Sequence, residues 1–202
     1  DMSNEFPDHL VSLLKTSKYL HLATASKDLI PSCSIMHYLY VNQSKTYTKE
    51  GHDLIILATP EDSSKFQNML ENPNVALLIH DWVTAKKISL AKNSTSEVNL
   101  IDKESEQHQK LQQSGQNNRL LNLLQEMNQA ELSQMSATLN GQVSIVDCAK
   151  SPEEYGYYKD LLLKDDPDAH AYVDNENERV AIIKVKVNSV KISDNENNTK
   201  TI

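Results

Sequence analysis

The chain has 202 residues, a net charge of −8, 39% hydrophobic and 24% charged residues, enough for one large domain or two small ones. The acidic balance argues against nonspecific nucleic-acid binding, because phosphate backbones select basic surfaces. No apolar run approaches the roughly 18 residues of a membrane span, and no secretory signal is recognisable. Cys33 and Cys148 lack metal-ligand spacing. We therefore expect a cytoplasmic protein with reduced thiols and possible access to the nucleus.

The N-terminal part predicts a helix followed by two strands. Pro7–Thr16 places apolar residues at helical spacing after a proline, a pattern typical of a short amphipathic helix. Tyr19–Ala25 alternates between apolar and polar residues, and Pro31–Val41 is a long run of mixed character. Both patterns predict strands, the second with one face toward a core and the other toward a ligand. A polar loop containing Gly51 should follow.

The next stretch predicts a strand, a helix and a second strand. Asp53–Ala58 is a short apolar run that Thr59 and Pro60 end. Glu61–Asn72 has apolar residues at helical spacing, and Val75–Ile79 is a second apolar run. Apolar runs of this length between turn residues are typical of buried strands.

A polar insertion interrupts the chain after the second apolar run. Lys86–Ala91 can continue a strand, whereas residues 92–135 are rich in Ser, Gln and Glu. Helical spacing returns over Asn118–Met135. We expect a flexible segment up to about Gln109 and a packed helix after it.

Two strands and a helix are predicted beyond the insertion. Ser136–Cys148 has a strand pattern, and Gly141 inside it suggests a bulge or a close backbone approach. A serine, a proline and two acids open a helix over about 151–164. Arg179–Ile192 is the clearest alternating strand of the chain, and a polar tail follows it.

These patterns amount to about six strands and three or four helices. Their order indicates an α+β fold, mainly antiparallel β, rather than a regular βαβ repeat. Because strands dominate and helices interrupt them, we expect a small closed barrel with helices at its ends.

Residues Thr59–Lys65 gather hydroxyl groups, a cation and a predicted helix N-terminus. Ser63, Ser64 and Lys65 can donate to phosphate oxygens, with the lysine acting as a point charge. The other interpretation is a capping box that starts at Thr59 and leads into a solvated helix face. The two acids inside this stretch favour the second interpretation, because they would repel a phosphate. Spacing alone leaves both open.

Metal ligands and nucleophiles are poorly represented. His21, His37 and His80 lie in predicted strands, but their spacing matches no compact ligand set, so no metal site is predicted. The chain has no GxSxG, GxGxxG or Walker motif, which argues against a hydrolase elbow and against Rossmann or P-loop nucleotide enzymes. Trp82, the single tryptophan, can pack on the core edge or on a flat ligand.

Several short motifs follow one another in a fixed order. LATA occupies residues 22–25, Pro31 leads the next strand, and an Ala-Thr pair ends the third. Ser-Ser-Lys at 63–65 and Asn-Pro-Asn-Val at 72–75 come next, and Gly141 follows much later. The order and spacing of these motifs resemble the pyridoxamine 5'-phosphate oxidase-like FMN-binding split barrels, specifically a divergent eukaryotic, fungal member. The resemblance covers about residues 7–91 and 136–192.

The resemblance implies one FMN-binding split-barrel domain over residues 2–202, with six strands, peripheral helices and a polar, partly helical insertion at about 92–135. It also implies a homodimer with FMN at its interface and an unidentified small-molecule substrate, with no nucleic acid or membrane as partner. The residues it assigns to the isoalloxazine are Ser34, Ile35 and Met36, which would line the ring through strand backbone. Those it assigns to the ribityl phosphate are Ala58, Thr59, Ser63, Ser64 and Lys65. Trp82 and Ser136 would reach the ring from either subunit.

Two serines depart from the family pattern. Ser64 stands where the family often has arginine, and Ser34 stands where the oxidase proper has arginine. The Arg-Leu-His-Asp-Arg segment that reads pyridoxal phosphate is also not found at the end of the chain. The resemblance therefore implies an FMN-binding protein, and a flavin-dependent oxidoreductase of unidentified substrate if it is an enzyme. Two alternatives stay open: a true pyridoxamine or pyridoxine 5'-phosphate oxidase, and a non-catalytic flavin carrier or sensor.

Overall fold

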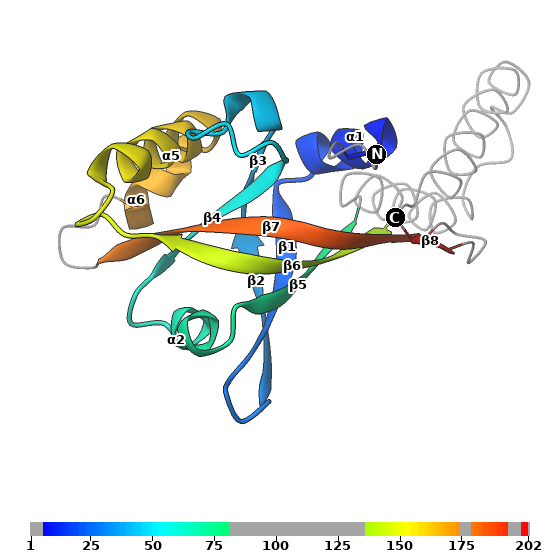
Figure 1. Ribbon diagram of the computed structural model, residues 1–202, viewed down its shortest axis with the longest axis horizontal. Helices are drawn as coiled ribbons and strands as arrows, with labels where there is room; N and C mark the ends of the chain where they lie inside the picture. Colours follow the sequence, from blue (N-terminus) through cyan, green and yellow to red (C-terminus); the bar gives the residue numbers. More distant parts are fainter. Residues whose placement is uncertain (1–5, 81–135, 174–178, 194–198, 202) are drawn as a thin grey trace, which may run out of the picture.

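The computed structural model describes residues 6–80, 136–173, 179–193 and 199–201. These residues form one antiparallel sheet flanked by helices (Figure 1). The strands are β1 Tyr19–Ala25, β2 Pro31–His37, β3 Leu39–Val41, β4 Leu54–Pro60, β5 Asn74–His80, β6 Ser136–Val146, β7 Val180–Ser193 and β8 Thr199–Thr201. The helices are α1 Asp8–Thr16, α2 Ser64–Glu71, α5 Pro152–Asp165 and α6 His170–Val173, with 3-10 turns η1 Gln43–Lys45 and η2 Pro167–Ala169. None of the described helices is long and apolar enough to cross a membrane.

The sheet curls into a barrel because one stretch of chain supplies both of its ends. The strand order is β2-β1-β5-β6-β7-β4-β3, so the path begins on β2 and ends on β3. β2 pairs with β1, β3 pairs with β4, and only Tyr38 separates the two strands in sequence. The strand predicted over Pro31–Val41 is therefore bent into two parts. With them counted as one, the barrel has six strands, and the predicted split barrel is confirmed.

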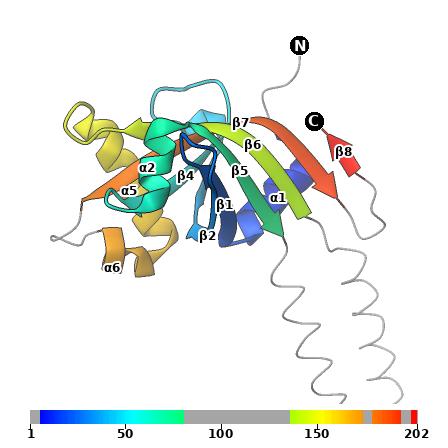
Figure 2. The same cartoon turned by 90° about the horizontal axis from the view of Figure 1, so that it is seen from below.

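The barrel interior holds the larger apolar core. Alternate residues of the strands point inward, as the two-residue period of a strand requires. The helices α1 and α2 lie beside the strands (Figure 2). Both add apolar side chains to this core. The contributing helical residues are Leu10, Leu13 and Leu14 of α1 and Phe66 and Met69 of α2.

A second apolar core lies between the outer face of the sheet and α5. Tyr158 and Leu162 of this helix pack with Ile56 of β4 and Ile182 of β7. β4 is consequently covered on both faces, since Ile55 belongs to the interior core. This explains why its sequence is a continuous apolar run rather than an alternating one.

Gly141 lies opposite a β-bulge in β7, whose extra residue is Asn188. The pairing of β6 with β7 shifts register between Asn140 and Gly141. A Cβ placed on Gly141 would lie 2.4 Å from the carbonyl oxygen of Lys186 on β7. The glycine is therefore required by close backbone approach, and this prediction is confirmed.

Two predicted boundaries are wrong. α2 begins at Ser64 rather than at Glu61, because Thr59 and Pro60 continue β4 and pair with β7. The polar tail is not all loop, since β8 pairs with the end of β7. The strand expected over Lys86–Ala91 and the helix expected over Asn118–Met135 lie outside the described residues, as does the rest of the insertion.

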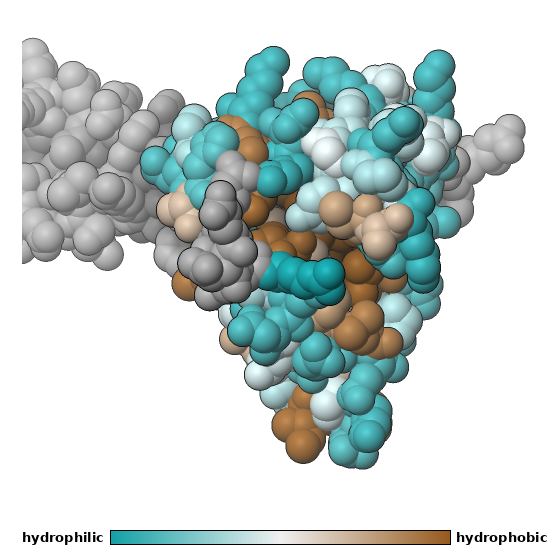
Figure 3. Space-filling view, turned by 90° about the vertical axis from the view of Figure 1, so that its left-hand side faces the viewer, coloured by the Kyte–Doolittle hydropathy of each residue, from teal (hydrophilic) through white to brown (hydrophobic). Residues whose placement is uncertain are grey.

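The hairpin between β1 and β2 ends in an apolar tip, seen at the bottom of Figure 3. Leu29 and Ile30 are 76% and 66% exposed. Leu29 also has a φ of 63°, a left-handed conformation that costs a branched side chain roughly 1 kcal/mol. Replacing Leu29 with asparagine, which tolerates this conformation, should therefore raise the free energy of unfolding by about 1 kcal/mol.

Chemical denaturation of the wild type and the Leu29→Asn variant would measure this difference. Ile30→Asn, at the neighbouring exposed position without the left-handed backbone, is the matched control and should give no gain. An equal gain in both variants would point to relief of apolar exposure instead of backbone strain.

Candidate functional site

The barrel has a split where the two ends of the sheet stop pairing. β3 pairs with β4 only over Leu54–Ile56, so the last part of β4, Leu57–Pro60, pairs with β7 alone among the described strands. β2 likewise pairs only with β1 in the part of the chain that the structure describes. β2 and β4 nevertheless approach each other. Their unpaired backbone edges therefore border the same gap in the wall.

The predicted ring-lining residues lie on the β2 side of this split. Ile35 projects from the outer face and is 59% exposed, whereas the Met36 side chain is buried in the barrel interior. Ser34 is half-buried. A ligand at the split could therefore meet the backbone of this strand and the side chain of Ile35.

The predicted phosphate-binding residues lie on the other side, at the end of β4 and the start of α2. Ala58 and Thr59 are buried. Thr59 Oγ1 lies 3.1 Å from Ser63 Oγ, and Ser63 Oγ accepts the backbone N–H of Phe66 at 3.3 Å. The helix is thus capped by Ser63, and the expectation of a capping box starting at Thr59 is wrong.

Two residues of this group remain open to a ligand. Ser64 is exposed and Lys65 is half-buried. Their backbone N–H groups belong to the first turn of α2 and have no acceptor within the helix. Two N–H groups, a hydroxyl and an ammonium fit the oxygens of one terminal phosphate or hydroxyl group of a ligand.

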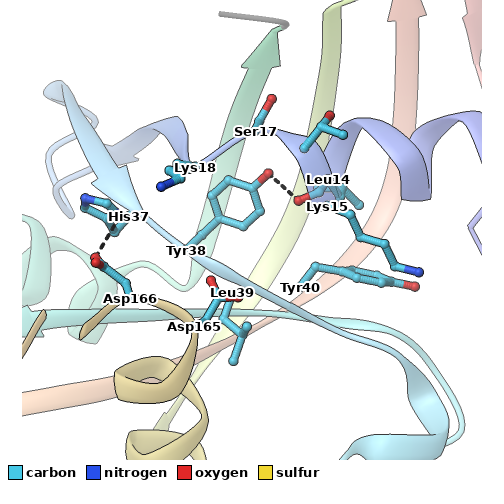
Figure 4. Close-up of a pocket in the computed structure, with 11 residues that line it drawn as sticks. Leu14, Lys15, Ser17, Lys18, His37, Tyr38, Leu39, Tyr40, Asp165 and Asp166 are labelled. Atoms are coloured by element: carbon cyan, nitrogen blue, oxygen red, sulfur yellow. Dashed lines mark hydrogen bonds and ion pairs between the residues drawn. The ribbon is translucent and has the colours of Figure 1, made fainter. Parts of the chain in front are cut away.

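A pocket of about 210 Å³ adjoins the split where β2 turns into β3 (Figure 4). His37 to Tyr40 line one wall, directly after the predicted ring-lining residues. Lysines from the end of α1 and the following turn line it together with carboxylates from the end of α5. The remaining lining residues are Leu14, Lys15, Thr16, Ser17, Lys18, Asp165 and Asp166.

Three contacts hold the bend between β2 and β3 in place. The Tyr38 hydroxyl donates to the carbonyl of Leu14 at 2.7 Å. Burial, and to a lesser extent the negative charge of Asp165, raises the pKa of this hydroxyl, which therefore remains a donor. His37 Nδ1 lies 3.2 Å from Asp166 Oδ2, and the Tyr19 ring packs on the histidine with centroids 4.1 Å apart.

Sequence reasoning missed this histidine–aspartate pair. It considered His37 only as one member of a metal set, and Asp166 lies in a distant helix end that carried no signal. His21 and His80 stack with ring centroids 6.0 Å apart, whereas His37 contacts Asp166. Among the described residues, no group of three or more histidine, cysteine or acidic side chains is placed to hold a metal ion.

Ser136 is the one further predicted ring contact within the described residues. Ser136 opens β6 and pairs with His80 of β5, and β5 is separated from β2 by β1. Ser136 is therefore three strands from β2, at roughly 4.8 Å per strand along the sheet. Trp82 lies outside the described residues.

A family model and curated relatives match nearly the whole chain. The model described as pyridoxamine 5'-phosphate oxidase matches residues 6–192. A pyridoxamine 5'-phosphate oxidase homolog of Saccharomyces cerevisiae is 46% identical over 199 residues, covering 98% of this chain and 94% of its own. A similarly named homolog of Schizosaccharomyces pombe is 34% identical over 194 residues, covering 96% and 88%.

Solved structures share the fold at low sequence identity. A NimC/NimA family protein from Clostridium acetobutylicum has a TM-score of 0.52 and 14% identity, covering 96% of this chain and 90% of its own. The heme storage protein HutZ from Vibrio cholerae has a TM-score of 0.51 and 11% identity, covering 89% and 87%. These likenesses concern the fold alone. The family model and the fungal relatives, in contrast, are decisive: the chain belongs to the pyridoxamine 5'-phosphate oxidase family.

Proposed function

We propose that this protein binds FMN in the split of the barrel and is a flavin-dependent oxidoreductase of unidentified substrate. The proposal rests on one observation: two segments that are distant in sequence border the same gap in the barrel wall. Residues 34–36 border it on β2, and residues 58–65 border it on β4 and α2. Bound FMN would supply hydride and electron transfer.

This chain's own groups would hold the cofactor at its two ends. Backbone along Ser34–Met36 would face the isoalloxazine. The first turn of α2, with Lys65, would take the phosphate, because N-terminal N–H groups and an ammonium both donate to anionic oxygens. The pocket beside His37 would then lie at the substrate side of the ring, closed off by the Asp166 contact.

The proposed FMN site predicts a measurable role for Lys65. Replacing Lys65 with alanine should weaken FMN binding about tenfold, since a charge-assisted hydrogen bond is lost. Lys27→Ala, on the β1–β2 turn, removes the same charge elsewhere and should change nothing. Flavin fluorescence titration of the purified full chain would give both affinities. A protein that takes up no added FMN would refute the proposed function itself.

A homodimer is the proposed assembly, because the outer face of β2, β1 and β5 presents apolar side chains. Ile35, His21 and Leu78 stand in one row across these strands, and Ile35 and Leu78 are 59% and 40% exposed. Tyr19 on the same strand as His21 is 41% exposed. Exposed apolar faces of this kind are typical of protein interfaces. A partner's Ser136 could reach the ring in such a dimer.

If the proposed dimer forms, Leu78→Asp should dissociate it into monomers, because a carboxylate would be buried at the interface without a partner. We expect at least a tenfold weaker dimer. Leu70→Asp makes the same change at a 54% exposed position on α2 and should leave the dimer intact. Light scattering after size-exclusion chromatography gives the masses. A monomeric wild type, or a dimeric Leu78→Asp protein, would contradict the proposal.

The two alternative functions are separated by simple assays. A true oxidase would turn over pyridoxamine 5'-phosphate, and the serines at positions 34 and 64 make this the weaker candidate, because neither offers the planar fork of an arginine. A flavin carrier or sensor would bind FMN and leave it unreduced by any tested substrate.

A further inference from the structure

The pocket at the bend between β2 and β3 is small and partly apolar (Figure 4). Its volume of about 210 Å³ equals that of roughly seven water molecules at about 30 Å³ each. Leu14 and Tyr38 are buried lining residues, and Leu39 and Tyr40 are half-buried ones. The pocket therefore suits a molecule of about amino-acid size that has a short apolar part.

Charges of both signs line this pocket without pairing with each other. Lys15 and Lys18 come from the last turn of α1 and the residues after it. Asp165 and Asp166 are the last residue of α5 and the residue after it. The ion pairs between described residues include neither of these lysines. A ligand with one ammonium and one carboxylate would compensate both kinds of charge at once.

One carboxylate oxygen of the pocket lacks the hydrogen bond that a buried acceptor normally has. Asp166 Oδ1 accepts the backbone N–H of Asp168 at 3.2 Å, whereas Asp166 Oδ2 is buried and has no hydrogen-bond partner among the described residues. His37 Nδ1 lies 3.2 Å from this oxygen, but the contact is not aligned as a hydrogen bond. An unsatisfied buried acceptor is costly. A positive group in the pocket would offset part of that cost.

The other carboxylate acts on the buried part of the pocket while it stays open to solvent. Burial, and to a lesser extent the negative charge of Asp165, raises the pKa of the Tyr38 hydroxyl. The Asp165 side chain is exposed, and no ion pair between described residues includes it. An ammonium group in the pocket would therefore lie near one accessible carboxylate and one buried carboxylate.

We infer that this pocket binds a small zwitterion, namely an amino acid with an apolar side chain. Its ammonium would lie toward the two carboxylates at the end of α5, and its carboxylate toward the two lysines at the end of α1. A ligand with only one charge would leave the lining charges of the other kind uncompensated. The role of this amino acid as a substrate rests on the function proposed above, whereas its binding does not.

The experiment compares L-leucine with two analogues that each lack one charge. Isoamylamine lacks the carboxylate, and isocaproate lacks the ammonium. Nuclear magnetic resonance titration of the isotope-labelled full chain, free of flavin, gives the three dissociation constants. We expect leucine to bind about tenfold more tightly than either analogue, because each analogue loses charge-assisted hydrogen bonds. The amide signals of Tyr38 and Leu39 should shift on binding.

The outcomes separate this inference from the proposed flavin site, because the same sample is also titrated with FMN. Uptake of FMN without binding of leucine would overturn the inference and leave the flavin site standing. Binding of leucine without uptake of FMN would support the inference and overturn the proposed function. Either analogue binding as tightly as leucine would overturn the inference, since one charge would then suffice.

Charge-removing variants give an independent readout. Asp165→Asn should weaken leucine binding about tenfold without weakening isocaproate, which has no ammonium. Lys15→Met combined with Lys18→Met should weaken leucine similarly without weakening isoamylamine. Asp168→Asn and Lys164→Met remove exposed charges near the end of α5 that do not line the pocket, and both should leave leucine binding unchanged. Equal weakening in the pocket and control variants would contradict binding in this pocket.

Discussion

Replacing Gly141 with alanine is expected to lower the free energy of unfolding by about 2–3 kcal/mol, the cost of overpacking a filled site. The added methyl group would lie 2.4 Å from the carbonyl oxygen of Lys186 and 3.1 Å from a methyl group of Val185. The first neighbour is backbone in the longest strand pair of the barrel. Relief therefore requires β6 and β7 to separate, and both strands hold interior core residues.

Gly156 is the matched control for this substitution. It lies inside α5, and a Cβ there meets nothing within 4 Å. Gly156→Ala should therefore raise the free energy of unfolding by about 1 kcal/mol through helix propensity. Urea denaturation followed by circular dichroism measures both variants. Equal effects at the two glycines would mean that the bulge yields easily, contrary to the geometry.

The second large effect is expected at Lys184. Its ammonium lies 2.6 Å from Glu50 Oε1 and 2.7 Å from Glu154 Oε1, joining β7 to the loop before β4 and to α5. All three side chains are 14–19% exposed. Lys184→Met leaves two carboxylates facing each other with little solvent. We expect a loss of about 3 kcal/mol, the lower end for breaking a mostly buried ion pair.

Two further variants separate charge from packing. Glu50→Gln and Glu154→Gln combined with Lys184→Met remove the stranded charges and should recover most of the loss. Lys150→Met removes an exposed lysine that lies 3.5 Å from Asp147, with its side chain 84% exposed, and should cost less than about 0.5 kcal/mol. A triple variant no more stable than Lys184→Met would show that the lysine's packing, not its charge, holds the elements together.

The ion pairs also predict how this loss depends on pH. Burial raises the pKa of Glu50, but the hydrogen bond and charge of Lys184 outweigh it, so that this pKa lies below its ordinary value. Burial lowers the pKa of Lys184, and its two carboxylate partners more than compensate, so that this pKa is raised. The stabilisation by Glu50 is therefore present above its unfolded pKa and lost as pH falls through the folded one. That of Lys184 is lost as pH rises through its folded pKa.

The difference between wild type and Lys184→Met should consequently be largest near neutral pH and should shrink toward pH 3. Protonated Glu50 no longer needs the lysine. Denaturation midpoints measured across this range would test the sign. A difference that grows as the pH falls would contradict the assignment of Glu50 as the ionised partner.

Local sequence patterns predicted those strands and turns that are determined by their own residues. Tyr19–Ala25 has the bounds of β1 that were predicted, and burial alternates along the strand. Gly141 indicated the close approach of β7, because a Cβ at this position would overlap a backbone carbonyl oxygen. The continuous apolar run in β4 indicated a strand covered on both faces, and two separate cores cover it.

Features set by distant contacts could not be predicted in this way. The bend at Tyr38 arises because the residues before it pair with β1 and the residues after it pair with β4. α2 begins later than predicted because Thr59 and Pro60 pair with β7 and belong to the sheet. Ser63 is therefore the residue that caps the helix. The pairing of His37 with Asp166 joins the barrel wall to a helix end far along the chain, and neither residue has a sequence neighbour that reveals it.

The split has a further meaning for the behaviour of this protein in a crowded cell. β2 carries no lysine, arginine or acid over Pro31–His37, and one backbone edge of it is unpaired within the described sheet. Uncharged edges of this kind readily add a strand from another chain and so begin aggregation. A flavin bound at the split, as proposed above, would cover that edge. A bound ligand would then also protect the folded protein from aggregation through this strand edge.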